Sequence, residues 1–389
     1  MERDQAIRYM RDLLKLMVDK KGSDLFITTD FPAAIKIDGK VTPVSKTLLT
    51  DENTKALTYA VMNDRQLKEF EATRECNFAI APQGVGRFRV NAFVQQGSTG
   101  MVLRVIETTV PTIEQLGLPE VMKEVSMTKR GLVIMVGGTG SGKSTSLAAM
   151  INHRNENSYG HIITVEDPIE YVHPHKNCIV TQREVGVDTE DWAVALKNTL
   201  RQAPDVILLG EIRDRETMEM GVTFAETGHL AMATLHANSA NQALDRIINF
   251  FPEERRPQLL MDLSLKLKAV IAQRHLKHVG GKGRVAAIEV MLNTPLIADL
   301  ILKGQVHQIK EIMSKSNEQG MKTFDQALFD LYDSGQISYE DALRSADSMN
   351  ELRLRIKLES TQSRGRDPLG GIENLSIEHE DSESHLGRA

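Results

Sequence analysis

Residues 137–144 read Gly-Gly-Thr-Gly-Ser-Gly-Lys-Ser and match the pattern G-x-x-x-x-G-K-[ST] in full. The apolar run 132–136 before this loop predicts a buried strand, and residues 145–150 after it predict the start of a helix. In that setting backbone N–H groups curl around phosphate oxygens, and the helix dipole attracts the anion. Lys143 is expected to reach the β and γ phosphates, and Ser144 to offer its hydroxyl to Mg²⁺. We therefore predict a nucleoside triphosphate site made by Gly137, Gly138, Thr139, Gly140, Ser141, Gly142, Lys143, Ser144 and Thr145.

A second segment, residues 162–170, is a predicted strand that runs directly into an acidic cluster. In a parallel α/β sheet, carboxylates at the carboxyl end of a strand face the ligand crevice. There they can hold water molecules around Mg²⁺ or orient a nucleophilic water. Glu166 is the preferred catalytic candidate because it is the first carboxylate after the strand. Asp167 has an alternative role as a cap of the turn at Pro168.

A third segment places Gly210 and Glu211 after a buried strand predicted over 205–209. This is the layout of a Walker B strand, with Glu in place of the commoner Asp. We predict that Glu211 polarises the attacking water, either directly or through the Mg²⁺ shell, because phosphoryl transfer depends on positioning and charge stabilisation. The alternative is a surface glutamate that follows a core strand.

Two histidines flank another apolar strand, which we predict over 230–235. His229 precedes this strand and His236 follows it. We interpret the pair as contacts to the γ-phosphate, or as a link between nucleotide state and an interface, because a neutral imidazole can donate to a phosphate oxygen. A structural role fits either residue alone equally well. A metal site is not favoured, because no third ligand is patterned nearby.

The length and the order of predicted elements indicate more than one domain. The 389 residues exceed an ordinary single domain, and strands and helices alternate from residue 131 onward as in a doubly wound parallel sheet. We expect an α+β domain over 1–110, a nucleotide-binding core over 111–253 and a helical region over 254–358 that completes this core. Residues 359–389 carry seven acidic residues against three arginines, and this composition predicts a disordered acidic tail. The tail is either inert or a binding site for a partner.

The composition of the chain argues against several classes of protein. The formal net charge is −6 and aromatic residues make up 5%, so a nucleic-acid-binding protein is not favoured. Two cysteines form no disulfide or metal pattern, which fits a reducing compartment. There is no hydrophobic leader and no stretch of 18 apolar residues, so we expect a cytoplasmic protein that is at most peripheral to a membrane.

Taken together, these motifs make residues 5–350 resemble the secretion ATPase superfamily of type II and type IV secretion. Within it, the chain is most similar to the PilT/PilU family of type IV pilus retraction ATPases, and among these to PilU. The resemblance rests on the phosphate-binding loop and on the segments around Glu166, Glu211 and the two histidines. It also includes Asp245-Arg246-Ile247-Ile248 before Phe250-Phe251-Pro252.

The resemblance implies a fold and an assembly. A RecA-like P-loop NTPase domain would follow an α+β, PAS-like domain and precede a C-terminal helical region. Six subunits would form a homo-hexameric ring of ATPases that use ATP and Mg²⁺. By analogy with the family, Arg89 and Arg104 of the N-terminal domain are candidates for contacting phosphate. An arginine on a rigid strand can act as a bidentate donor, and a purely structural role is the alternative.

Several departures from the usual PilT pattern favour a PilU-like protein. Gly138 replaces the usual proline of the loop, Gln202-Ala203 replaces an acidic pair, and Ala298 replaces the arginine of a C-terminal signature helix. A charged helix predicted over 349–358 and the tail extend the chain. The expected function is a cytoplasmic ATPase motor at the inner-membrane pilus base that promotes pilus retraction and twitching motility. Its implied partners are a PilT-like ATPase and the inner-membrane platform protein. Two alternatives are an ATP-binding accessory subunit that reinforces the PilT ring and, from another class, a RecA-like DNA translocase.

Overall fold

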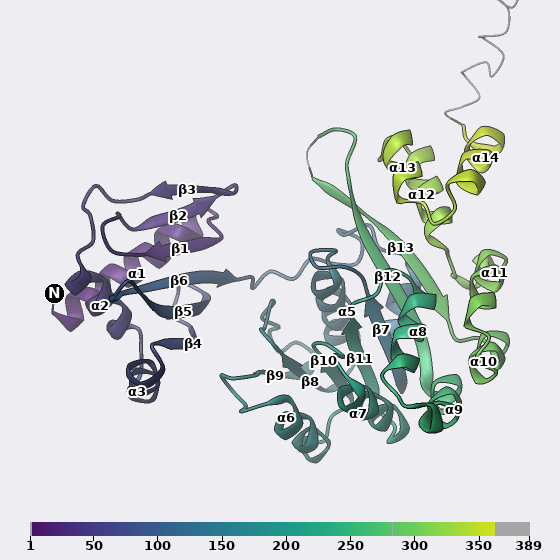
Figure 1. Cartoon of the computed structure of the whole chain (residues 1–389), viewed down its shortest axis with the longest axis horizontal. Coiled ribbons are helices and arrows are strands. Elements are labelled where there is room, and N and C mark those ends of the chain that lie inside the picture. Colours follow the sequence, from purple (N-terminus) through teal and green to yellow (C-terminus); the bar gives the residue numbers. More distant parts are fainter. Residues whose placement is uncertain (1, 282, 362–389) are drawn as a thin grey trace, which may run out of the picture. The chain divides into compact units, whose positions relative to one another are not determined.

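The computed structural model describes residues 2–281 and 283–361 of the chain. These residues form a mixed α/β structure with an N-terminal antiparallel sheet, a largely parallel sheet and C-terminal helices (Figure 1). One compact unit contains the chain up to Arg274 together with Ile288–Lys322. Among the described residues, a second unit contains the segment around β12 and β13 that begins at His275 and ends at Ala287, together with residues 323–361.

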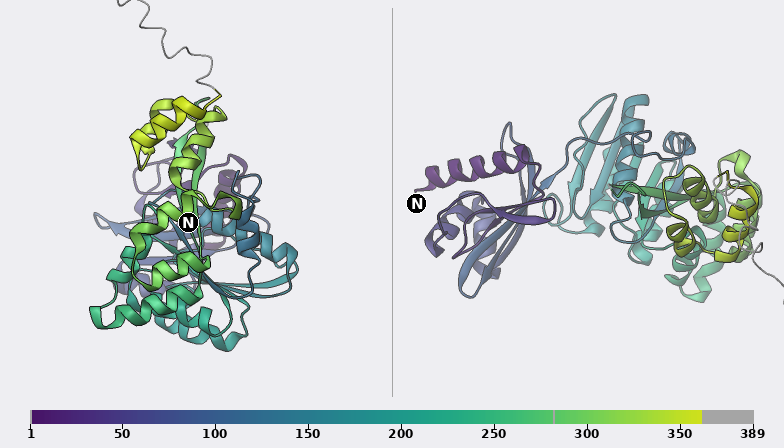
Figure 2. Two further views of the ribbon diagram at one scale, coloured as in Figure 1. Left: turned by 90° about the vertical axis from the view of Figure 1, so that its right-hand side faces the viewer. Right: turned by 90° about the horizontal axis from the view of Figure 1, so that it is seen from above.

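The N-terminal sheet has six antiparallel strands in the order β3-β2-β1-β6-β5-β4. Helix α1, the purple helix at the N-terminus in Figure 2, runs along this sheet and packs on β1 and α2. Asp38 and Gly39 join β2 to β3 with φ values of 48° and 81°, and Asp-Gly is a common sequence for such a tight hairpin turn. The elements are α1 (Arg3–Asp19), β1 (Asp24–Ile27), β2 (Ala34–Ile37), β3 (Lys40–Pro43), α2 (Asp51–Ala60), α3 (Asp64–Thr73), β4 (Glu75–Ile80), β5 (Arg87–Gln95) and β6 (Ser98–Ile106).

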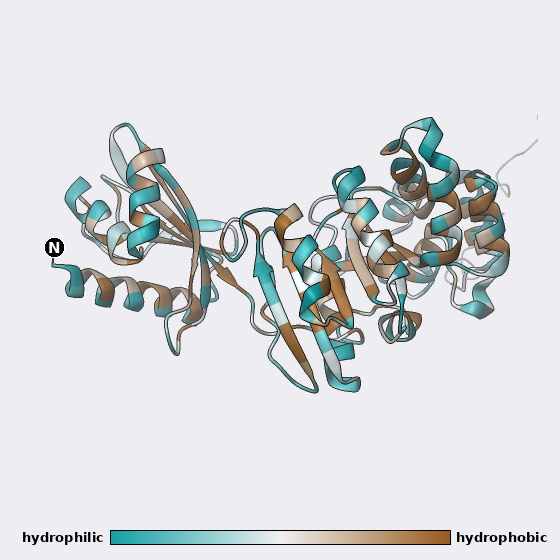
Figure 3. Cartoon of the chain, turned by 90° about the horizontal axis from the view of Figure 1, so that it is seen from below, coloured by the Kyte–Doolittle hydropathy of each residue, from teal (hydrophilic) through white to brown (hydrophobic). Residues whose placement is uncertain are grey.

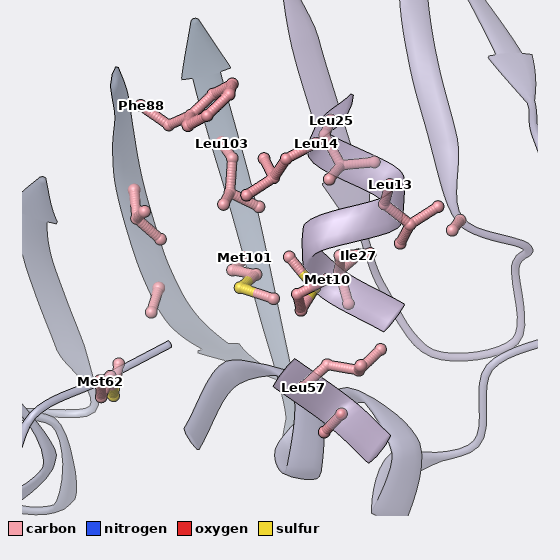
Figure 4. Packing of buried hydrophobic residues seen from close by; sticks show 14 of the residues in the cluster. Met10, Leu13, Leu14, Leu25, Ile27, Leu57, Met62, Phe88, Met101 and Leu103 are labelled. Atoms are coloured by element: carbon pink, nitrogen blue, oxygen red, sulfur yellow. The ribbon is translucent and has the colours of Figure 1, made fainter. Parts of the chain in front are cut away.

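The core of this N-terminal part lies between α1, α2 and one face of the sheet (Figure 4). Apolar residues of α1 recur at helical spacing, and those of β5 and β6 alternate, so each element buries one face. Met10, Leu14, Phe88, Met101 and Leu103 are all at most 1% exposed. Because side chains alternate along a strand, Arg87 and Arg89 of β5 lie on the other face of the sheet.

The second sheet contains seven strands in the order β13-β12-β7-β11-β10-β8-β9. Strands β12, β7, β11, β10, β8 and β9 run parallel to one another. Every residue of β7, β10 and β11 is buried, and nearly all of these residues are apolar. Figure 3 shows hydrophobic residues, in brown, on strands and helices of the structure. Because the strands are parallel, their carboxyl ends meet at one edge of the sheet. The strands are β7 (Gly131–Val136), β8 (Gly160–Glu166), β9 (Cys178–Glu184), β10 (Val206–Leu209), β11 (Leu230–Leu235), β12 (Leu267–Lys277) and β13 (Arg284–Leu292).

Helices cover this sheet, with α5 against β7 and β9 and with α6 and α7 against β8, β11 and β7. Within residues 2–281 and 283–361, no helix combines the length and the hydrophobicity that crossing a lipid bilayer requires. The helices of this region are α4 (Val121–Ser126), α5 (Lys143–Asn157), α6 (Trp192–Thr199), α7 (Arg215–Glu226), α8 (Ala240–Asn249), α9 (Arg256–Lys266), α10 (Pro295–Leu302) and α11 (Ile309–Ser314), with short 3₁₀ turns at Leu200–Gln202, Glu253–Arg255, Val306–Gln308 and Asn317–Gln319.

The expectation of a helical region over 254–358 is wrong for two long segments, which form β12 and β13. Strand β12 is rich in residues that favour helices, such as Leu, Lys, Ala, Gln and Arg, so local propensity gives little sign of a strand. Pairing with β7 overrides this propensity, because β12 completes the hydrogen bonding of a buried strand. Strand β9 is a further element that the sequence analysis does not predict.

Three helices form most of the second compact unit: α12 (Phe324–Asp333), α13 (Tyr339–Ser345) and α14 (Met349–Glu359). Helix α14 confirms the predicted charged helix, and its Arg355 guanidinium lies 4.5 Å from the centre of the Phe329 ring. The Ser360 and Thr361 hydroxyls donate to Asp333 Oδ1 at 2.8 and 2.9 Å, so the chain up to residue 361 contacts this unit. Most of the predicted acidic tail, residues 362–389, lies outside the described residues.

Candidate active site

The phosphate-binding loop connects β7 to α5, as the sequence predicts, and α5 begins at Lys143. Gly137 has a φ of 158°, and a Cβ built on it would lie 2.4 Å from Ser141 Oγ and 2.6 Å from Gln273 O. A side chain at this position would therefore disrupt the loop. A Cβ on Gly138, in contrast, would meet no atom of the described residues within 4 Å. The loop packs tightly against β12, the strand that carries Gln273, whereas the space beside Gly138 is open. A cradle for phosphate requires such an open side.

Lys143 is 9% exposed, and its Nζ donates to Gly137 O at 2.8 Å and to Gly138 O at 3.0 Å. Burial lowers the pKa of Lys143, and the charge of Glu211 opposes that effect. The next residues, Ser144 and Thr145, lie in the first turn of α5, and Thr145 Oγ1 lies 3.0 Å from Tyr171 Oη. The sequence therefore places a cation and two hydroxyls at the N-terminus of a 15-residue helix, where anions are favoured.

A cleft of about 370 Å³ opens at the carboxyl edge of the sheet beside this loop. It brings together residues from all the predicted motifs, because the ends of β7, β8, β10 and β11 meet at this edge. The lining residues that the sequence analysis selects are Thr139, Gly140, Lys143, Ser144, Glu166, Glu211 and His236.

Glu166 is the last residue of β8 and accepts hydrogen bonds from Thr164 Oγ1 at 2.6 Å and from Gln182 Nε2 at 3.2 Å. Burial raises the pKa of Glu166 to about 7, against the lowering effect of these hydrogen bonds. A carboxyl group with such a pKa can accept a proton near neutral pH. This environment is suited to general-base chemistry.

Glu211, just beyond β10, has a different environment. Its Oε2 accepts from Arg213 Nε at 2.8 Å, and its Oε1 lies 3.2 Å from His236 Nε2. Arg213 also lies 3.4 Å from Asp167 Oδ2 and 5.8 Å from the centre of the Trp192 ring. The hydrogen bond to Glu211 is the main reason that the pKa of Arg213 is raised. A cation thus holds Glu211 in place beside the cleft.

His229 lies at the other end of β11 from His236 and is not among the residues that line the cleft. The six residues of β11 lie between the two histidines, so seven residue steps of about 3.3 Å separate their Cα atoms by roughly 23 Å. His229 Nδ1 instead lies 3.0 Å from Thr227 Oγ1 and 3.2 Å from Phe224 O, at the C-terminus of α7. The geometry therefore favours the structural role for His229 and opposes a contact with nucleotide held in the same cleft.

Arg89 and Arg104 lie directly opposite each other on β5 and β6 of the N-terminal sheet. Arg104 Nε donates to Asp24 Oδ1 at 2.8 Å, and this aspartate is 4% exposed. Neither arginine is among the residues that line the cleft. The structure therefore places Arg89 next to Arg104. A contact between either arginine and phosphate stays a prediction.

The cleft also contains polar and aromatic residues that were not selected from the sequence, among them Tyr171, His173 and Trp192, and Gln182 lies behind Glu166. Burial lowers the pKa of His173 to about 4, and no described residue makes a hydrogen bond to its Nδ1. Trp192 packs near Gly210, where a built Cβ would lie 3.2 Å from its Cη2 atom. These residues come from a loop, an edge strand and a helix start that carry no motif of their own. Only the fold brings them to the cleft.

Comparison with known proteins identifies the family. The family model described as Type II/IV secretion system protein matches residues 2–344. The chain belongs to this family. It is also 61% identical over 372 residues to the type IV pilus ATPase PilU of Pseudomonas aeruginosa, covering 95% of this chain and 97% of that relative. The chain is therefore a homologue of PilU within the Type II/IV secretion system protein family.

The chain is also similar to relatives of the PilT type. The type IV pilus retraction ATPase PilT of P. aeruginosa is 45% identical over 335 residues, covering 86% of this chain and 97% of PilT. A crystal structure of the pilus retraction motor PilT with bound ADP superposes with a TM-score of 0.83 at 39% identity, covering 88% of this chain and 98% of that one. These similarities confirm that the chain is a PilU-type pilus ATPase related to PilT, and they agree with the sequence prediction of an ATPase.

Proposed function

We propose that this chain is a subunit of a hexameric motor that hydrolyses ATP and promotes type IV pilus retraction and twitching motility together with a PilT-like ATPase. The observation that carries the hydrolytic part is the gathering of Lys143, Glu166 and Glu211 around one cleft. The extensive identity to PilU supports the pilus part. The proposal includes a RecA-like core preceded by a PAS-like domain, and a location in the cytoplasm at the inner-membrane pilus base beside the platform protein.

Each residue has a role in the proposed hydrolysis. Lys143 and the N–H groups of the loop bind the β and γ phosphates and stabilise the charge that develops on them. Glu166 accepts the proton of the attacking water, because its raised pKa of about 7 suits a proton acceptor. Glu211, held by Arg213 and His236, orients that water.

The residues of the cleft also fit Mg²⁺ bound together with the nucleotide. Ser144 would hold the ion through its hydroxyl, and Mg²⁺ would neutralise charge on the β and γ phosphates. Mg²⁺ commonly takes few protein ligands because it keeps waters and phosphate oxygens in its shell.

An accessory role is the second candidate, and one observation favours it. Helix α10 (Pro295–Leu302) carries Ala298 where the related signature has arginine. That signature helix is associated with retraction in the family, so its altered residue favours dependence on a partner ring. The cleft itself retains Lys143 and both carboxylates, which favours hydrolysis by this chain.

Steady-state ATPase activity of the purified full-length chain, alone and mixed with a PilT-like ATPase, distinguishes these functions. A motor subunit shows turnover above background that Lys143→Ala abolishes. To assign turnover in the mixture, the PilT-like partner should carry its own inactivating loop substitution. If the wild-type chain shows no ATP hydrolysis either alone or in that mixture, the accessory role replaces the proposed motor.

A further inference from the structure

Gln182 lies on edge strand β9, directly opposite Thr164 of β8, and its side-chain amide contacts three groups. Its Nε2 donates to Glu166 Oε1 at 3.2 Å and to Tyr171 O at 2.8 Å. Its Oε1 accepts from the backbone N–H of His173 at 2.7 Å. Both ends of the amide are therefore engaged by groups around the cleft.

The chemistry of these partners fixes which end of the amide faces Glu166. The His173 N–H can only donate, so it requires the oxygen of Gln182, and the Tyr171 carbonyl can only accept, so it requires the nitrogen. The amide nitrogen is then the atom beside Glu166. A glutamine held in this way presents a permanent donor to the carboxylate in either protonation state.

We propose that Gln182 is a positioning residue for ATP hydrolysis that holds the Glu166 carboxylate in its reactive orientation and connects it to the phosphate-binding helix. This inference rests on the role proposed above for Glu166. Thr164 supplies a second donor to the same oxygen, Oε1, at 2.6 Å. Two donors on one oxygen fix the plane of the carboxylate and favour its charged form.

Tyr171 supplies the connection to the helix. Gln182 binds its carbonyl oxygen, while its phenolic oxygen lies 3.0 Å from Thr145 Oγ1 at the start of α5. Thr145 directly follows Ser144 in the phosphate-binding loop. Hydrogen bonds at both ends of Tyr171, one to its backbone carbonyl and one to its side chain, thus connect Glu166 and Gln182 to the helix that receives the phosphates. Positioning to within about 0.5 Å is the scale on which such supporting contacts affect catalysis.

Several other charged groups lie near Glu166. A substitution of Gln182 leaves them unchanged, so a difference in activity between that variant and wild type reports the contact between Gln182 and Glu166. Burial is the main cause that raises the pKa of Glu166 to about 7, and the charge of Glu170 adds to it. Glu184 lies opposite Glu166 on β9 and accepts from the backbone N–H of Ile169 at 3.2 Å. The other titratable or charged residues of the cleft are Lys143, Asp167, Glu170, Tyr171, His173, Glu211 and His236.

The test measures kcat, KM for ATP and the pH profile of kcat for full-length Gln182→Leu, Thr164→Val and Glu166→Gln. We expect Gln182→Leu to lower kcat roughly tenfold with KM within about twofold of wild type, because the contact acts on the transition state rather than on binding. The acidic limb of its profile should move to higher pH, because the carboxylate loses a donor that favours its charged form. Thr164→Val removes the second hydrogen-bond donor to Glu166 with little change of side-chain volume. It should lower kcat and move the pH profile in the same direction. If Gln182→Leu does not fold, the result for Thr164→Val tests the proposal instead.

Thr181→Val is the matched control. Thr181 is the neighbouring residue on β9, and its hydroxyl contacts His161 Nε2 at 2.8 Å, away from Glu166. Its kcat and pH profile should equal those of wild type. If Glu166→Gln keeps wild-type kcat, the proposed role of Glu166 is wrong and this inference is overturned with it. If Glu166→Gln loses activity while Gln182→Leu and Thr164→Val keep wild-type kcat and profile, only the role of Gln182 is wrong.

Discussion

At the scale of single residues, two carboxylates at neighbouring strand ends have different environments. Glu166 is buried and receives hydrogen bonds from neutral donors, whereas Glu211 contacts Arg213 directly. Such a difference assigns different tasks to two groups of the same type. The protonation state of Glu166 is therefore the variable through which pH should control turnover.

We predict that ATP turnover falls as the pH is lowered through 7. Burial places the pKa of Glu166 at about 7, and the proton acceptor must be ionised, so activity is present above this pKa and lost below it. At pH 6 about one tenth of the carboxyl is ionised, which predicts turnover roughly tenfold below the plateau above pH 8. The measurement is kcat between pH 5.5 and 9 at saturating Mg·ATP. A profile that is flat from pH 6 to 8, with chemistry rate-limiting, would contradict the assignment of Glu166.

At the scale of elements, the tip of β10 depends on a glycine. A Cβ on Gly210 would lie 3.1 Å from both Glu166 Cα and Val165 O. Gly210→Ala should therefore separate the ends of β8 and β10, lower ATPase activity and destabilise the protein by about 1–3 kcal/mol, as overpacking does.

Gly221→Ala is the matched control for that substitution. Gly221 lies within α7, and its Cβ would meet only Leu132 Cδ1 among the described residues, at an ordinary 3.6 Å. Alanine in a helix interior is more stable than glycine by about 0.5–1 kcal/mol, so this variant should keep full activity and a thermal midpoint at or above wild type. Equal activity of both variants would show that the β10 tip tolerates displacement.

The elements that could be predicted from the sequence are those whose own residues carry a recognisable local signal. The phosphate-binding loop and the fully buried, largely apolar strands β7, β10 and β11 carry such signals, and β11 has the predicted bounds. Strands β9 and β12 do not, because their composition is mixed and they form by pairing with a buried neighbour. Gln182 and Trp192 could not be selected for the same reason, since only the path of β9 and the start of α6 bring them to the cleft.

At the scale of the whole molecule, the arginines of the N-terminal sheet test assembly. Arg104 has its ion pair with Asp24, so Arg89 is the better candidate for contacting a neighbour's nucleotide. In rings mixed from wild-type and Arg89→Ala subunits, the turnover of wild-type subunits should fall as the variant fraction rises. Lys55→Ala, which removes another cation of the same domain, is the control. Wild-type subunits with unchanged activity at every ratio would exclude action on a neighbour.

The C-terminal extension is predicted to affect association rather than stability. Residues 362–389 carry six acidic residues against three arginines, and attraction of such a segment to a basic surface weakens with salt over a Debye length of about 8–10 Å. Cutting after residue 361 keeps the contacts of Ser360 and Thr361 with Asp333. The thermal midpoint should remain unchanged, while capture of the PilT-like partner at low salt should decrease. Identical capture by both proteins at low and high salt would show that the extension has no role in binding.

The most direct test of the central claim separates ATP binding from hydrolysis at the cleft. Trp192 is the only tryptophan of the chain and lines the cleft, so its fluorescence can report binding while phosphate release reports turnover. Wild type should bind and hydrolyse ATP, Lys143→Ala should lose productive use of ATP, and Glu211→Gln should bind normally but hydrolyse roughly a hundredfold or more slowly. Wild-type hydrolysis in Lys143→Ala would contradict the account, because the cleft would then not be where ATP is hydrolysed, and wild-type hydrolysis in Glu211→Gln would contradict the role of Glu211.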